Sequence, residues 1–177
     1  DAYAGTGAYA DGTPSTPIHI MEAILAKPDM HSRMVTIFND KDAASVAALK
    51  DRISTLPNMH LLTHQPEFWN FPVDAAFPAR LGGDNETVPC LFFIDPWGYK
   101  GLSLGLLKRT IRSWGCDCIF FFNYNRINPA VNNQIVDHLI DDTFGVERAN
   151  NLRALTAGLT PIQREHTIVN ELVAAIA

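Results

Sequence analysis

The sequence has few cysteines and no long apolar run. Its 177 residues include three cysteines, a small odd number that excludes the disulfide framework of small secreted domains. No run approaches the roughly 18 apolar residues of a membrane span, and no signal-peptide pattern is recognised. These absences predict a protein of a reducing, cytoplasmic compartment with no membrane contact.

The chain also lacks an excess of positive charge. It has 14 Lys and Arg against 19 Asp and Glu, a net charge of −5, which argues against a protein that coats nucleic acid by charge alone. A local basic groove stays open. The 47% apolar content excludes long disorder, and the length suits one domain with at most an appendage.

Several catalytic and metal-binding patterns are absent too. The sequence contains no P-loop, nucleophile elbow or Ser-His-Asp order, and His60 and His64 have helical spacing without the Glu of a metalloprotease. Cys116 and Cys118 are too close for a zinc knuckle, and Cys90 is remote from them. We therefore expect no metal site and three buried thiols.

Apolar periodicity predicts strands that alternate with helices. The expected strands are 34–38, a weaker one at 61–62, 88–94 and 119–122; the expected helices are about 17–27, 42–55, 74–81 and 102–113, with a loop over 65–73. Beyond Pro129 the pattern is helical over 130–142, 145–156 and 161–176. This alternation predicts an α/β fold, a doubly wound, mostly parallel, Rossmann-like sheet over residues 1–128, with a helical appendage over 129–177.

Four polar clusters follow the expected strands. They are Asp1–Gly7, Asn39-Asp40, Asp95–Tyr99 and Asn123–Arg126. In doubly wound sheets, ligands bind at the carboxyl ends of the strands, so these clusters define the expected site. No strand precedes the first cluster, and we expect the core to be incomplete at its N-terminal side.

The first two clusters are typical of a cofactor site. Gly5 and Gly7 allow a backbone to approach a ligand closely, although an ordinary glycine turn is an equal alternative. Asp40 is placed to accept both hydroxyls of a ribose. Its alternative role is to cap the next helix, for which Asp42 is the better candidate.

The third cluster, Asp95-Pro96-Trp97-Gly98-Tyr99, suits a flat substrate that carries an amine. A carboxylate accepts a hydrogen bond from an exocyclic amine, and an aromatic side chain stacks on a base. The alternative is a turn whose aromatic side chains pack inward. Lys108, with Arg109 and Arg112, gives a basic helix face that either contacts phosphate or is simply solvated.

Together these motifs resemble class I S-adenosylmethionine-dependent methyltransferases. Asp-Ala-Tyr-Ala-Gly-Thr-Gly at residues 1–7 is similar to their motif I, and residues 95–99 are similar to motif IV. Asp11-Gly12-x-Pro14-x-x-Pro17, and Asn123-x-x-Arg126 after residues 93–101, point further to the three-Cys-motif partner (TcmP) proteins, a bacterial and phage-associated family. The resemblance covers residues 1–128. It departs from the usual Asp-Pro-Pro-Tyr form, which leaves adenine N6 and guanine N2 both open as methyl acceptors.

The resemblance implies S-adenosylmethionine as cofactor and a nucleic acid as substrate. The residues that it assigns to the cofactor are Asp1, Tyr3, Ala4, Gly5, Gly7 and Asp40, the last at the ribose. Those that it assigns to the methyl acceptor are Asp95, Pro96, Trp97 and Tyr99, with Asn123, Arg126 and Lys108 as further substrate contacts. In such an enzyme catalysis is mostly positioning, because the sulfonium methyl is already activated.

Two other functions compete with a nucleobase methyltransferase. One is an inactive binding module of the same fold that works with a protein partner in a phage-related or defence system. The other is a nicotinamide-dependent dehydrogenase, which the absence of a Tyr-x-x-x-Lys proton donor at the Asp95 strand end disfavours. The sequence does not indicate an oligomeric state.

Overall fold

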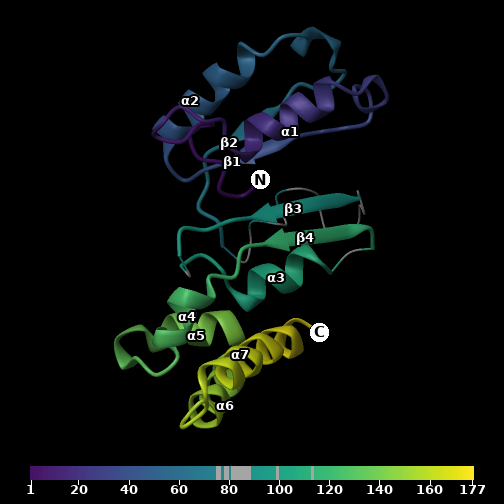
Figure 1. Cartoon of the computed structure of the whole chain (residues 1–177). Coiled ribbons are helices and arrows are strands. Elements are labelled where there is room, and N and C mark those ends of the chain that lie inside the picture. Colours follow the sequence, from purple (N-terminus) through teal and green to yellow (C-terminus); the bar gives the residue numbers. More distant parts are fainter. Residues whose placement is uncertain (75–76, 78–79, 81–88, 99, 113) are drawn as a thin grey trace. The chain divides into compact units, whose positions relative to one another are not determined.

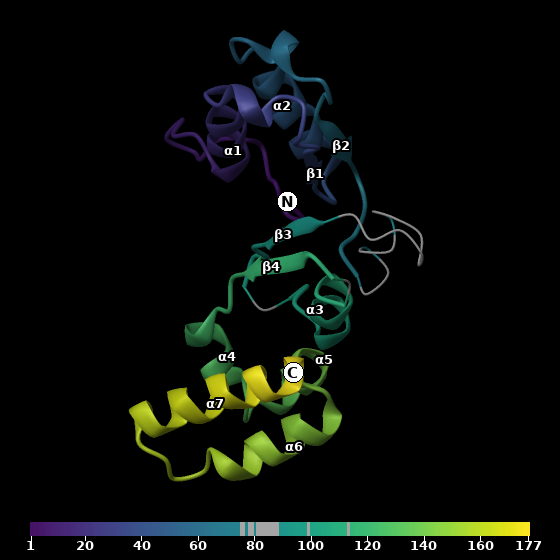
Figure 2. The same cartoon turned by 90° about the vertical axis from the view of Figure 1, so that its right-hand side faces the viewer.

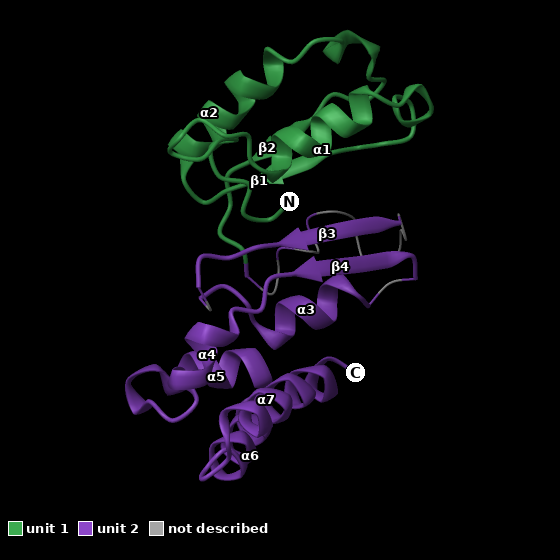
Figure 3. Ribbon diagram, in the orientation of Figure 1, with its two compact units in different colours: residues 1–73 green, residues 74–177 purple. Residues whose placement is uncertain are grey.

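The computed structural model describes residues 1–74, 77, 80, 89–98, 100–112 and 114–177. Figure 1 and Figure 2 show the helices and strands from two directions. Figure 3 colours the two units into which the chain divides, residues 1–73 and 74–177. Within the described residues, each unit contains one parallel pair of strands.

The first unit is a strand–helix–strand arrangement preceded by a helix. Its elements are α1 (Thr16–Leu25), the 3₁₀ helix η1 (Pro28–Met30), β1 (Ile37–Asn39), α2 (Ala43–Ser54), the 3₁₀ helix η2 (Met59–Leu61) and β2 (Glu67–Trp69). Pro17 lies in the first turn of α1, where its missing N–H costs no hydrogen bond. β1 and β2 pair in parallel with Phe38 opposite Phe68, and α2 makes the crossover that parallel strands require.

The core of the first unit forms where α1 and α2 pack on β1. Its buried members are Ala4, Ile18, Met21, Ile24, Phe38, Leu49, Ile53 and Leu62. Ile18, Met21 and Ile24 recur at helical spacing and present one apolar face of α1. Ala4 belongs to the same cluster, so the segment that carries the first glycine motif is anchored in the core.

The second unit joins a strand pair to a group of helices. Its described elements are β3 (Cys90–Ile94), α3 (Leu104–Thr110), β4 (Cys116–Phe120), α4 (Tyr124–Ala130), the 3₁₀ helix η4 (Gln134–Val136), α5 (Asp137–Phe144), α6 (Val146–Leu155) and α7 (Pro161–Ile176). β3 and β4 are parallel, from Cys90 opposite Cys116 to Ile94 opposite Phe120. In Figure 1 and Figure 2, α3 lies beside this strand pair, and α6 lies beside α7.

The helices of the second unit enclose an apolar core of their own. Ile127, Val131, Ile140, Phe144, Ala149, Leu152 and Ile168 are all fully buried there. Thr160 and Gln163 form a reciprocal capping box that starts α7. None of the helices in the described part of the chain has the length and apolar character of a membrane span.

The prediction of a doubly wound, mostly parallel Rossmann-like sheet is wrong. Among the described residues the strands form two separate two-stranded sheets, β1–β2 and β3–β4. Alternating strands and helices specify strand–helix–strand units, because each parallel pair needs a crossover. The alternation does not specify that two such units share one ladder, which is the step on which the prediction failed.

Smaller differences concern individual strands. β2 lies inside the predicted loop over 65–73, where Glu67 N–H donates to Thr36 O at 2.9 Å, and Leu61 belongs to η2 and not to a strand. β4 begins three residues before the predicted strand. The prediction missed this start because Cys-Asp-Cys lacks the apolar run that marks the end of β4. The helix predicted over 74–81 lies largely outside the described residues.

Candidate functional site

The first four residues run alongside β1 and bring the glycine motif to its carboxyl end. The Asp1 nitrogen donates to Ile37 O at 2.9 Å, and Asn39 N–H donates to Asp1 O at 2.9 Å. Further along the same N-terminal segment, Ala4 N–H donates to Asn39 O at 2.8 Å. These bonds place the predicted cofactor residues of the first unit beside Asn39 and Asp40.

Asn39 holds three chain segments together at this point. Its buried side-chain amide donates to Ala2 O and to Phe71 O, both at 3.0 Å, and its Oδ1 accepts from Phe71 N–H at 3.0 Å. The residue is fully buried, and a buried amide is tolerated only when its hydrogen bonds are made. Asn39 therefore fixes the positions of the segments on either side of the candidate site.

Asp40 connects the glycine motif to the start of α2. Its Oδ2 accepts from Gly5 N–H at 3.0 Å, and its Oδ1 accepts from Asp42 N–H at 2.9 Å. Asp42, not Asp40, caps α2, since its carboxylate accepts from Ser45 N–H at 3.1 Å and from Ser45 Oγ at 2.7 Å. A carboxylate offers about four lone-pair positions, so Asp40 keeps acceptor capacity that these two bonds do not use.

The two glycines of the motif have different surroundings. Both have positive φ, +63° at Gly5 and +85° at Gly7, which favours glycine at each position. A Cβ on Gly7 would lie 2.9 Å from Leu49 Cδ1, so Gly7 packs closely against the side chains of α2. A Cβ on Gly5 would have no atom within 4 Å, so the surroundings of Gly5 are open.

Tyr3 is a half-buried phenol next to the same carboxylate. Burial, and secondly the negative charge of Asp40, raise the pKa of Tyr3 to about 12. The Tyr3 N–H donates to Asp1 Oδ1 at 3.0 Å. Tyr3, like an ordinary tyrosine, is neutral at physiological pH, and the raised pKa keeps it neutral well into the alkaline range.

The predicted acceptor residues lie in the second unit, after β3. Asp95 is exposed, Pro96 is buried, and the Trp97 side chain is 99% exposed. Trp97 is therefore not packed inward, which was the alternative reading of this cluster. Tyr99 lies outside the described residues.

The remaining predicted substrate residues also belong to the second unit. Asn123 caps α4, where its Oδ1 accepts from Arg126 N–H at 3.3 Å. The Arg126 and Lys108 residues are exposed, Lys108 in the last turn of α3. Asp95 and Asn123 thus follow neighbouring parallel strands, but the local role of Asn123 is that of a helix cap.

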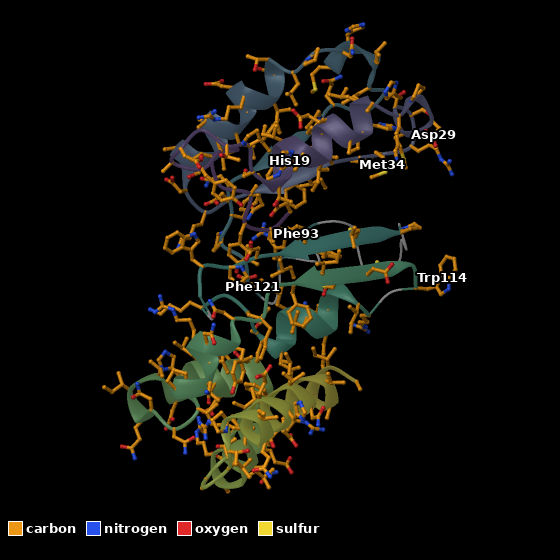
Figure 4. All side chains as sticks on the ribbon, viewed as in Figure 1. His19, Asp29, Met34, Phe93, Trp114 and Phe121 are labelled. Carbon is orange, nitrogen blue, oxygen red and sulfur yellow. The ribbon has the colours of Figure 1, made fainter. Side chains whose placement is uncertain are left out.

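Other aromatic side chains lie near these strands. Figure 4 shows Trp114 extending from the turn that leads into β4, and Phe93 and Phe121 beside the strand pair. Trp114 is 85% exposed and Phe121 is 52% exposed. Among the described residues, no group of three or more His, Cys, Asp or Glu side chains could hold a metal ion.

Sequence reasoning missed the role of Asn39 in the first unit. It noted Asn39 only as a polar residue at a strand end, whereas the structure uses every polar atom of its side chain to join segments 32 to 37 residues away. The sequence did contain a signal for this role. An asparagine directly follows Ile37 and Phe38 in a strand, where asparagine is depleted, so its presence there needs a specific reason.

The chain was also compared with known proteins. No family model, no curated protein and no solved structure matches it.

Proposed function

We propose that the chain binds S-adenosylmethionine through its first unit and transfers the methyl group to an exocyclic amine of a nucleobase. The observation that carries the proposal is the 3.0 Å hydrogen bond from Gly5 N–H to Asp40 Oδ2. It joins a glycine motif and an acidic residue that are 35 positions apart in the sequence. An acid beside a glycine turn at a strand end is the arrangement that nucleotide cofactors use.

The residues of the first unit fit an adenosine cofactor. Gly5 leaves open space where any other residue would place a Cβ, and Asp40 has unused lone pairs for ribose hydroxyls. The cofactor would supply an activated methyl group on a sulfonium.

The second unit offers groups suited to the methyl acceptor. Asp95 is an exposed carboxylate that can accept a hydrogen bond from an exocyclic amine, and Trp97 is an exposed ring on which a base can stack. Asp95 would orient the amine whose nitrogen receives the methyl group, and Trp97 would hold the base by stacking. The proton that the nitrogen then loses passes to Asp95 or to water.

A binding module without transfer is the second candidate. It is favoured by the use of the Asn123 side chain as the cap of α4, which occupies a predicted substrate contact in a purely local role. The 99% exposure of Trp97 suits nucleic-acid stacking equally well without chemistry. In this reading the chain acts with a protein partner in a phage-related or defence system.

Calorimetric titration of the full chain with S-adenosylmethionine and with S-adenosylhomocysteine tests the cofactor proposal. We expect roughly micromolar binding. Gly5→Ala should abolish it, because the new methyl fills the open space. Gly12→Ala is the matched control, since Gly12 has a φ of +85° and equally open surroundings but lies outside the site. If neither compound binds the unmodified chain, the proposal fails.

Asp40→Asn tests the ribose contact. Loss of a hydrogen bond to a charged group should weaken cofactor binding about tenfold or more. Asp42→Asn is its control, because asparagine is also a good helix cap and Asp42 makes no predicted cofactor contact. Equal effects of the two substitutions would contradict the assignment.

Transfer of a labelled methyl group to DNA and RNA separates the two candidates. An enzyme should transfer label, and Asp95→Ala should abolish the transfer while leaving cofactor affinity unchanged. A binding module should bind the cofactor or nucleic acid with no transfer at all. Loss of cofactor affinity in Asp95→Ala would contradict the role assigned to Asp95.

A further inference from the structure

The three cysteines of the second unit lie on one face of the β3–β4 pair. Residues 90, 92 and 94 of β3 share a face with residues 116, 118 and 120 of β4, because side chains alternate along each strand and the register is in phase. Cys90 lies directly opposite Cys116, whereas Cys118 lies opposite Phe92. The register therefore distinguishes one cysteine pair from the third cysteine.

The backbones around Cys90 and Cys116 are in close contact. Cys90 N–H donates to Gly115 O at 3.1 Å. The preceding residues also touch, since a Cβ on Gly115 would lie 3.4 Å from Pro89 Cβ. Neighbouring strands lie about 4.8 Å apart, inside the roughly 4.4–6.8 Å range of Cα separations found across disulfides.

Cys116 also affects the Cys90 thiol electrostatically. Burial, and secondly the nearby Cys116, raise the pKa of the Cys90 thiol. Both residues are only partly buried, so a small reagent can reach them. Burial raises the pKa of the Cys118 thiol as well, and the Thr110 side chain of α3 partly offsets this.

We propose that Cys90 and Cys116 form a reversible intramolecular disulfide when the chain meets a low-molecular-weight disulfide. The thiolate of one cysteine attacks the small disulfide, forms a mixed disulfide and releases one small thiol. The thiolate of the other cysteine then attacks the protein sulfur of that mixed disulfide and releases the second small thiol. The two cysteines lose two electrons and two protons, and the small disulfide is reduced to two thiols.

The Cys90–Cys116 disulfide would form and break with the redox conditions, and would not be a permanent crosslink. Side chains directly opposite in a parallel ladder are held further apart than the Cβ atoms of a relaxed disulfide, so the bond is strained and readily reduced. It ties the starts of β3 and β4, whereas Asp95 and Asn123 follow their other ends. This proposal is independent of the proposed methyl transfer.

Peptide mapping after oxidation tests the link. The full chain is treated with glutathione disulfide at mildly alkaline pH, and its remaining thiols are blocked and counted. The thiol count should fall from three to one. Digestion after Arg and Lys together with digestion before Asp separates Cys116 from Cys118, because Asp117 lies between them. The expected product is a peptide pair joined through Cys90 and Cys116, which dithiothreitol separates again.

Cys118→Ser is the matched control, since it removes a neighbouring thiol on the same face. It should leave the Cys90–Cys116 link intact. Cys90→Ser and Cys116→Ser should each abolish the link and leave a glutathione adduct on the remaining cysteine. If a variant does not fold, the peptide map of the unmodified chain still shows whether Cys90 and Cys116 are linked. A Cys90–Cys118 link, a link between two chains, stable adducts without a link, or three unreacted thiols would each overturn the proposal.

Discussion

At the end of β1, the side chains of Asn39 and Asp40 bind the backbone of two other segments, at Ala2 and Gly5 and at Phe71, whereas at the end of β3 Asp95 is exposed and Trp97 contacts almost nothing. Both strand ends carry an acid, and both were predicted to belong to a ligand site. The first is held in place by the hydrogen bonds of the buried Asn39 side chain. The same kind of strand-end residue is therefore preorganised in one unit and left open to solvent in the other.

The two units also differ in the kinds of interaction that stabilise them. The second unit has a helical core around Phe144, which is fully buried among α4–α7 residues. The first unit adds to its apolar core a buried polar clamp at Asn39. Substitutions that separate apolar from polar stabilisation therefore test the comparison.

The largest effect is expected for Phe144→Ala in the second unit. Removing a fully buried aromatic ring costs about 3–5 kcal/mol of stability, because the cavity that remains does not collapse completely. Urea unfolding measures the loss, and hydrogen exchange should accelerate in peptides from residues 124–177. Phe121→Ala, at a ring that is 52% exposed, is the control and should cost less than about 1 kcal/mol. Similar costs for both substitutions would contradict the assigned core.

Asn39→Leu should have the next largest effect, in the first unit. Leucine has a similar size but offers no hydrogen bonds, so buried backbone groups of Ala2 and Phe71 lose this partner. The expected loss is about 3 kcal/mol. Asn70→Ala removes an exposed hydrogen bond to Asp40 O and should cost under about 1 kcal/mol. Equal unfolding midpoints for the two variants would show that Asn39 is not a clamp.

The titration of Tyr3 should report the charge of Asp40. In the unmodified chain the Tyr3 pKa is about 12. Because the folded value lies above the ordinary 10, the stability that Tyr3 contributes is complete below pH 10 and is lost as pH rises toward 12. Asp40→Asn should lower the pKa of Tyr3 only partly, since burial is the larger cause.

Phenolate absorbance measures this titration, with Tyr3→Phe subtracted as the reference. A Tyr3 pKa near 10 in the folded, unmodified chain would contradict both its burial and its neighbourhood to Asp40. An unchanged value in Asp40→Asn would contradict the second cause alone.

The smallest effect is expected at the exposed cap Asp42. Hydrogen bonds from Ser45, first from its side chain and then from its backbone N–H, lower the pKa of Asp42 below 3.8. The stability that this cap contributes is therefore present above pH 3.8 and is lost as pH falls through the lowered folded value. Thermal midpoints measured from pH 6 to 2.5 should fall less steeply in Asp42→Asn than in the unmodified chain. Parallel curves would show that the cap does not titrate as described.

Much of the local structure could be predicted from sequence patterns. The spacing of Ile18, Met21 and Ile24 predicted α1, and Asp42 was correctly preferred over Asp40 as the cap of α2. The apolar run after Pro89 predicted β3. These features depend on residues close in sequence, so the pattern alone contains the information.

The strand β2 and the role of Asn39 could not be predicted in this way. Glu67-Phe68-Trp69 is too short to show a strand period, and it becomes a strand because β1 offers it a ladder. The Asn39 amide has its function through Ala2 and Phe71, each more than 30 residues away. Such pairings are decided by which segments meet, which local propensity does not encode.

The sequence by itself determined helices such as α1, α2, α6 and α7, the cap of α2, the parallel strand–helix–strand units and the polar residues at the strand ends. Only the tertiary structure decided that the strands pair as β1–β2 and β3–β4 within the described residues, that Gly5 and Asp40 meet, and that Cys90 faces Cys116. The physical reason is the separation along the sequence over which each interaction acts. Periodicity and capping act within a few residues, whereas ladder partners and register are chosen by hydrogen bonds and packing between segments far apart in the chain.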